Sequence, residues 1–134
     1  MVDTLTREEI LALDDREGEW VEVPEWKGRR FYVAPMDGER RGLWDQQMLS
    51  LRGTRLAVNA DNVDSRIVAL TVVDPETREL LFTLADVEKL GRKNALALRR
   101  LSGVGARLSG IDAEAVSQLV ELLGKVQSSS SGAA

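Results

Sequence analysis

The side chains that could carry out catalysis in this chain are carboxylates, since its 134 residues include no cysteine and no histidine. This absence excludes thiol nucleophiles, disulfides, imidazole bases and zinc sites of the usual kind. Two carboxylate pairs are candidates for acid–base or metal chemistry, Asp14 with Asp15 and Asp61 with Asp64. Adjacent helical residues diverge by about 100°, so the first pair does not converge on one substrate atom. Attraction to the positive end of a helix explains the second pair better.

The sequence carries no signal for a phosphate-binding cofactor or a membrane span. Its 11 glycines form neither G-x-x-x-x-G-K-[ST] nor G-x-G-x-x-G. No apolar stretch approaches the roughly 18 residues of a membrane span, and the opening Met1-Val2-Asp3 is not that of a signal peptide. A composition of 43% hydrophobic and 30% charged residues is that of a soluble globular domain. We therefore expect a cytoplasmic protein without metal or cofactor, and not an enzyme.

Charge is divided unevenly along the chain. Residues 1–25 contain nine acidic residues against two arginines, whereas residues 89–107 contain six basic residues and no acid. The two segments could pair with each other, contact a third molecule or simply be solvated faces. At 100° per residue, Lys93, Arg99, Arg100 and Arg107 fall within an arc of about 120° beside an apolar helix face. No aromatic residue is interleaved with this basic stripe and the net charge is −4, so we do not expect nucleic-acid binding.

Three tryptophans are the remaining candidates for recognition. Trp20 and Trp44 are expected in the core. Trp26 falls in a predicted hairpin loop, where an aromatic side chain either folds back on its domain or is presented to a partner. The candidate partner-binding residues are therefore Trp26 and three arginines of the basic stripe, Arg99, Arg100 and Arg107.

Capping signals and β-favouring runs define the first half of the fold. Thr6 and Glu9 have capping-box spacing, which predicts a helix over residues 6–15. Two β-favouring runs flank a loop with proline and glycine, which predicts a hairpin at residues 19–34. Asp37 is expected to cap a helix that continues to Leu51, and residues 52–61 show no clean period and are expected to be a loop.

The second half is predicted to be mostly helical. Residues 62–73 contain enough β-branched residues for a strand. Their apolar residues also recur at the spacing of one helix face, and we predict a helix. A turn at residues 74–77 and an extended piece at 80–82 precede helices that begin after Thr83, Asn94 and Asp112. The expected fold is α+β and mostly α, with an N-terminal helix and a β-hairpin packed on four to five helices. Residues 1–125 would form one domain and residues 126–134 a disordered Ser-rich tail.

The order of these segments resembles that of tail assembly chaperones from long-tailed, siphovirus-like bacteriophages. The resemblance begins with residues 5–15 (LTREEILALDD), 20–26 (WVEVPEW) and 33–40 (VAPMDGER). It continues through residues 66–74 (RIVALTVVD), 81–90 (LFTLADVEKL) and 106–111 (ARLSGI), and extends to about residue 124. It implies a non-enzymatic protein of the host cytoplasm that binds the long tape measure protein, keeps it soluble and is absent from the mature virion. The tail tube protein and a second copy of the chain are further candidate partners, with no nucleic acid and no membrane.

The sequence is also compatible with two other functional classes. One is a structural tail-completion or minor tail protein retained in the virion, and the other is a small enzyme that works through Asp and Glu alone.

The family that the sequence resembles is commonly made in two forms through a −1 ribosomal frameshift. Leu123-Gly124-Lys125 fits a slippery heptamer of the form G-GGA-AAG. Alternatively, Gly124 is a helix stop and Lys125 a favourable charge beside it.

Overall fold

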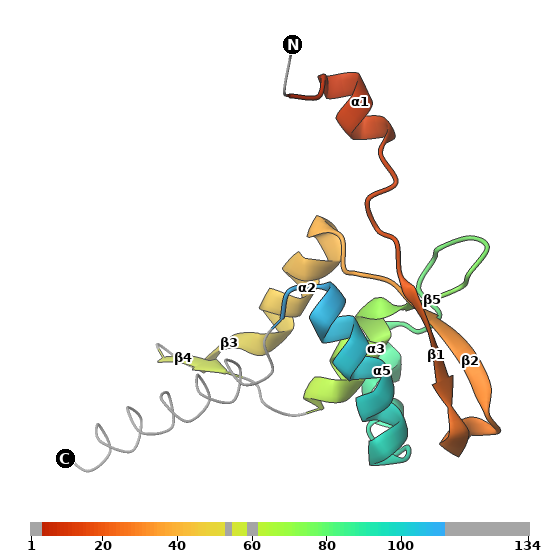
Figure 1. The fold of residues 1–134 in the computed structure, drawn as a ribbon. Helices are drawn as coiled ribbons and strands as arrows, with labels where there is room; N and C mark the ends of the chain where they lie inside the picture. Colours follow the sequence, from red (N-terminus) through yellow and green to blue (C-terminus); the bar gives the residue numbers. More distant parts are fainter. Residues whose placement is uncertain (1–3, 53–54, 59–61, 112–134) are drawn as a thin grey trace.

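The computed structural model describes residues 4–52, 55–58 and 62–111, and it has the predicted α+β class (Figure 1). About half of the described chain is helical, with five α-helices and a three-stranded antiparallel sheet. The helix expected after Asp112, the Ser-rich tail and Leu123-Gly124-Lys125 lie outside the described residues.

The N-terminal half contains a short helix and the predicted hairpin. Helix α1 (Arg7–Ala12) begins at Thr6, whose hydroxyl accepts a hydrogen bond from the Glu9 amide at 3.2 Å. The hairpin consists of β1 (Glu19–Val23), the 3₁₀ turn η1 (Pro24–Trp26) and β2 (Arg29–Val33). Strands β1 and β2 pair from Glu19 opposite Val33 to Val23 opposite Arg29. The predicted hairpin is confirmed, whereas the first helix is shorter than expected.

Four further helices belong to the part of the body that the structure describes. Helix α2 (Gly38–Met48) is capped by Asp37, whose Oδ1 accepts from the Arg40 amide at 2.8 Å. Helix α3 (Val63–Thr71) runs directly into β5 (Val72–Val73), which pairs with β2 and gives the sheet order β1-β2-β5. A 3₁₀ turn η2 (Leu84–Asp86) leads into α4 (Val87–Leu90), and α5 (Ala95–Leu108) follows.

Local capping explains where these later elements begin. Thr83 and Asp86 form a capping box before η2, and Asn94 Oδ1 accepts hydrogen bonds from the amides of Leu96 and Ala97. These bonds satisfy amide donors that the first turn of a helix leaves unpaired. Gly110 follows α5 with φ of +69°, a conformation that glycine adopts without the penalty a Cβ would bring.

The main core lies between the inner face of the sheet and helices α3, α4 and α5. Val23, Val33 and Val72 supply the sheet side and are fully buried. Helix α3 buries every residue from Ser65 to Thr71, which places it at the centre of the domain. A helix enclosed on all sides needs no polar face. This explains why residues 62–73 fit a strand pattern almost as well as a helix; the helix prediction is confirmed for Val63–Thr71.

Two predictions about the middle of the chain are wrong. The helix after Asp37 ends at Met48 instead of Leu51, and β3 (Leu49–Arg52) begins immediately. Residues expected to lie in a loop at 52–61 include β4 (Arg55–Val58), which pairs with β3 in a two-stranded sheet. A short hairpin needs only a few paired residues and a turn, so its sequence has too few positions to establish an alternating pattern.

Candidate partner-binding surface

The three arginines expected to bind a partner contact acidic residues of their own domain. Arg100 Nε donates to Glu25 Oε1 at 2.5 Å, and Arg107 Nη2 donates to Glu19 Oε2 at 2.6 Å. Both acids belong to the hairpin, so the acidic N-terminal region and the basic helix are partly each other's partners. Arg99 lies 3.7 Å from Asp64 of α3 and is largely exposed.

The contact between Arg100 and Glu25 has an electrostatic consequence. The hydrogen bond from the Arg100 guanidinium lowers the pKa of the Glu25 carboxyl below its ordinary value of 4.5, and its charge acts in the same direction. Glu25 is the better sheltered of the two side chains. The pair therefore joins the turn of the hairpin to α5 and favours the ionised form of Glu25.

Trp26 folds back on the domain. Its ring meets Phe31 edge-on at 5.5 Å between centroids, and both residues are half-buried against the main core. Trp26 and Phe31 thus pack on the side of the hairpin that faces the main core, which includes Leu98 and Leu101 of α5. Trp26 supports the hairpin more than it displays a binding surface.

Trp20 was expected in the core, and this prediction is wrong. Its residue surface is 51% exposed on the outer face of the sheet, whereas Trp44 is buried as predicted. In β1, Val21 and Val23 point toward the core, so the alternation of a strand places Trp20 on the opposite face. The alternation of strand residues therefore decides the position of Trp20, although tryptophan side chains are buried in most proteins.

The exposed ring of Trp20 is held in a defined position. It stands edge-on to Tyr32, its partner in the strand register, with 5.2 Å between ring centroids. The Arg30 guanidinium lies 5.3 Å from the centre of the Trp20 ring, and that of Arg78 lies 4.5 Å from the centre of Tyr32. Tyr32 in turn accepts a hydrogen bond from the Gly18 amide at 2.8 Å. A rigid aromatic ring bordered by arginines is the usual chemistry of an interface anchor.

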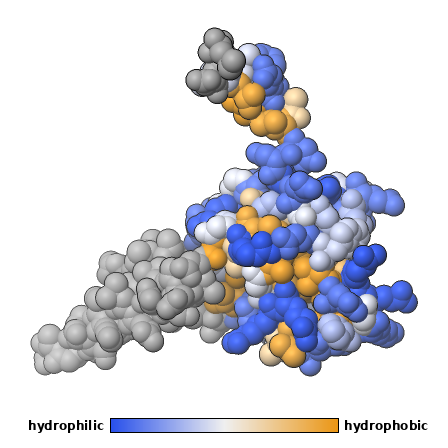
Figure 2. Space-filling model, viewed as in Figure 1, coloured by the Kyte–Doolittle hydropathy of each residue, from blue (hydrophilic) through white to orange (hydrophobic). Residues whose placement is uncertain are grey.

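A second exposed apolar surface belongs to the N-terminal arm, which we define as residues 4–15. Every residue of the arm is exposed, and α1 buries none of its side chains. The arm extends away from the body in Figure 1, and its apolar side chains gather on the surface in Figure 2. It carries four of the seven large hydrophobic residues that are exposed in the described chain, namely Leu5, Ile10, Leu11 and Leu13.

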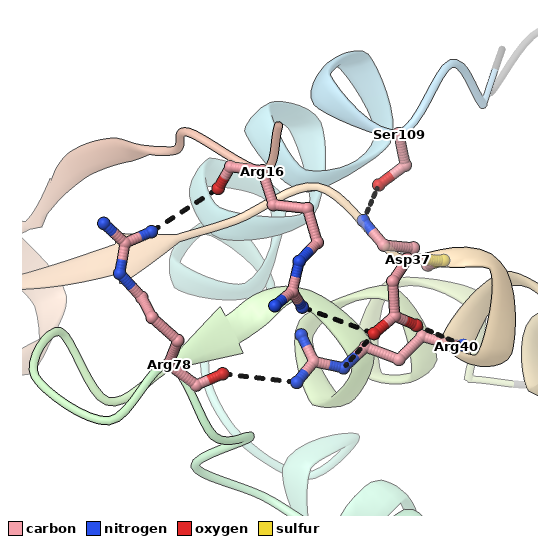
Figure 3. Close-up of polar contacts among 6 residues, drawn as sticks. Arg16, Asp37, Arg40, Arg78 and Ser109 are labelled. Atoms are coloured by element: carbon pink, nitrogen blue, oxygen red, sulfur yellow. Dashed lines mark hydrogen bonds and ion pairs between the residues drawn. The ribbon is translucent and has the colours of Figure 1, made fainter. Parts of the chain in front are cut away.

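A polar cluster anchors the arm to the body, and we call it the arginine clamp (Figure 3). Arg16 Nη1 donates to Asp37 Oδ2 at 3.3 Å, and the Arg16 carbonyl accepts from Arg78 Nη1 at 3.4 Å. Arg40 donates to the Arg78 carbonyl at 3.2 Å and lies 3.9 Å from Asp37. The clamp consists of Arg16, Asp37, Arg40 and Arg78. It joins the base of the arm to α2 and to the loop after β5.

The carboxylates considered for catalysis that fall within the described residues are not gathered at one place. Asp14 and Asp15 are exposed on the arm, and Asp61 lies outside the described residues. Asp64 accepts a hydrogen bond from Ser102 Oγ at 2.9 Å and so joins α3 to α5. Within the described ranges, no group of three His, Cys, Asp or Glu side chains is arranged to hold a metal ion. None of the helices that the structure describes is both long and apolar enough to cross a membrane.

Comparisons with known proteins found no match to a family model, to a curated protein or to a solved structure.

Proposed function

We propose that this protein is a tail assembly chaperone of a long-tailed bacteriophage. It binds the tape measure protein and keeps it soluble until the tail tube protein polymerises around it. The protein acts by binding, without catalysis, in the host cytoplasm, and it does not remain in the mature virion. The sequence resemblance, which covers residues 5 to about 124, names the client.

The structural observation that carries the proposal is the exposed, rigidly held Trp20. A chaperone for an apolar helical client needs apolar surface that its own core does not use. Trp20 meets this need on the outer face of the sheet, where Tyr32 and Arg30 fix its orientation. Ordering a ring that is already fixed costs little conformational entropy when the client binds.

The charges of the domain support a protein client in preference to a nucleic acid. Arg99, Arg100 and Arg107 each lie within ion-pair distance of a carboxylate, which reduces the positive field that a phosphate backbone would meet. The net charge of −4 opposes a polyanion further.

The proposal is tested by co-expression with the tape measure protein encoded in the same gene cluster. Wild-type chaperone should raise the soluble fraction of the tape measure protein, and Trp20→Ala should reduce this gain. Leu81→Ala is the matched control, because Leu81 is similarly exposed but lies in the loop between β5 and η2, outside the hairpin that carries Trp20. Its effect on client solubility should be small.

Two results would contradict the proposal. One is a tape measure protein that stays insoluble with wild-type chaperone present. The other is recovery of the protein in stoichiometric amounts from purified virions by mass spectrometry, which would indicate a structural tail protein.

A further inference from the structure

We propose that the arm of one copy docks on the outward face of α5 in a second copy, so that two chains exchange arms. We call this face the α5 strip, and it is formed by Leu96, Arg99, Arg100, Gly103 and Arg107. This inference goes beyond the proposed function, because it concerns self-association in the absence of any client.

The arm has the properties of a segment that packs against another protein surface. Leu11 is 69% exposed, and Ile10 and Leu13, three residues apart, are each at least half exposed. Ile10 and Leu11 belong to α1 and Leu13 is the residue that ends it, so the three exposed apolar side chains lie close together in the sequence of the arm. A six-residue helix is too short to be stable alone in water and gains stability by packing against another surface.

The α5 strip has the properties of a receiving surface. At 100° per residue its five members fall within one arc of about 100°, and all five are exposed. Leu96 is 55% exposed at one end of the strip. At Gly103, an added Cβ would meet no atom within 4 Å beyond its chain neighbours and the backbone of its own helix. A glycine with open space above it lets the backbone of another helix approach closely, as bulkier residues do not.

The charges of the two surfaces are complementary. The arm contains four acidic residues, Glu8, Glu9, Asp14 and Asp15, against one arginine, Arg7. The α5 strip contains three arginines, and helix α5 contains no acidic residue. Each arginine of the strip keeps exposed side-chain surface beside its acidic neighbour within the domain. An acidic, apolar segment is therefore matched to a basic, partly apolar face of the same chain.

The clamp explains why the partner is a second copy. Arg16 is fixed by Asp37 and Arg78 (Figure 3), and the arm leaves the clamp directed away from its own body (Figure 1). Reciprocal exchange gives each arm a strip and each strip an arm. The resulting dimer is closed by a two-fold axis, which is the commonest symmetry of homo-oligomers.

Self-association of the full chain can be measured by analytical ultracentrifugation over a range of concentrations and at two salt concentrations. We expect a monomer–dimer equilibrium that weakens as salt rises, because salt screens exposed charges. Gly103→Gln should raise the dimer dissociation constant about tenfold or more, since a side chain on the strip blocks close approach. Gly42→Gln is the matched control: Gly42 is an exposed glycine of α2 with equally open surroundings, and its replacement should leave the dimer intact.

A mixing experiment distinguishes arm exchange from other dimers. A variant with Ile10→Ser and Leu11→Ser keeps its strip, and Gly103→Gln keeps its arm. Each variant is first brought to a concentration at which it is monomeric alone, and an equimolar mixture at that concentration should form a heterodimer through the one remaining arm–strip contact.

Three outcomes would overturn the inference. They are a wild-type chain that stays monomeric at all concentrations, a dimer that Gly103→Gln leaves unchanged, or a mixture of the two variants that stays monomeric. These results are obtained without tape measure protein, so they do not depend on the co-expression result.

Discussion

The two glycines in the second half of α5 show how differently one residue type can be used within a single helix. An added Cβ at Gly105 would lie 2.5 Å from Thr71 Oγ1, whereas one at Gly103 would lie in open space. Thr71 is fully buried, and its hydroxyl donates to the Ile67 carbonyl at 2.6 Å, so it cannot move aside easily. Gly105 is therefore required for the close packing of α3 against α5, and Gly103 is not required by the fold.

This difference predicts opposite effects on stability. Gly105→Ala should lower the free energy of unfolding by about 1–3 kcal/mol, because it overpacks the core. Gly103→Ala should raise it by up to about 1 kcal/mol, because alanine loses less backbone entropy in a helix. Chemical denaturation at protein concentrations where the chain is monomeric measures both values. A destabilising effect of similar size at both positions would contradict this assignment.

At the scale of elements, the hairpin and α5 are joined by an apolar contact with charged edges. Phe31 and Trp26 supply the apolar part, and two ion pairs, Glu25 with Arg100 and Glu19 with Arg107, lie at its border. Exposed ion pairs contribute little to stability on average, and sheltered, hydrogen-bonded pairs contribute more. We therefore expect the pair that includes Glu25 to matter more than the one that includes Glu19.

The lowered pKa of Glu25 makes this contribution depend on pH. The pair stabilises the fold fully above the ordinary glutamate pKa of 4.5, and the contribution is lost as the pH falls through the lower pKa of the folded state. Glu25→Gln should thus lower the melting temperature at about pH 7 and have progressively less effect as the pH falls below 4.5. Thermal melts of both proteins across this range test the prediction. A difference between wild type and variant that does not change with pH would refute it.

At the scale of the whole molecule, the structure consists of a packed body and an arm attached at one point. The body is held together by α3 at its centre, while the arm contributes no buried residue. The arm is attached through the polar contact between Arg16 and Asp37. Gly18, two residues further along the chain, packs closely against the backbone of β2. The arm is thus well placed to interact with other chains, and its loss should not affect folding of the body.

Deletion of residues 1–13 tests this division. It leaves the clamp in place, so the free energy of unfolding should change by no more than about 0.5 kcal/mol at concentrations where the chain is monomeric. Asp37→Ala provides the contrast, since it removes the cap of α2 and the ion pair to Arg16, and it should cost about 0.5–2 kcal/mol. Loss of more than about 1 kcal/mol on deletion of the arm would show that the arm packs on the body in solution.

The sequence by itself determined the features that depend on neighbouring residues. Thr6, Asp37, Thr83 and Asn94 each begin an element through a hydrogen bond to an amide two or three residues away. The hairpin was likewise evident from two β-favouring runs and one turn. These interactions form within a few residues of chain, so the residue types and their spacing are enough to predict them.

Only the tertiary structure decided how distant segments use their side chains. Arg100 and Glu25 are separated by 75 positions, and Arg107 and Glu19 by 88, so nothing local couples them. The exposure of Trp20 and of the arm depends on which faces the body covers, and that is set by α3 occupying the centre. The type of a residue shows whether its side chain could be buried or form an ion pair. The packing of the whole chain determines which side chains are in fact buried or paired.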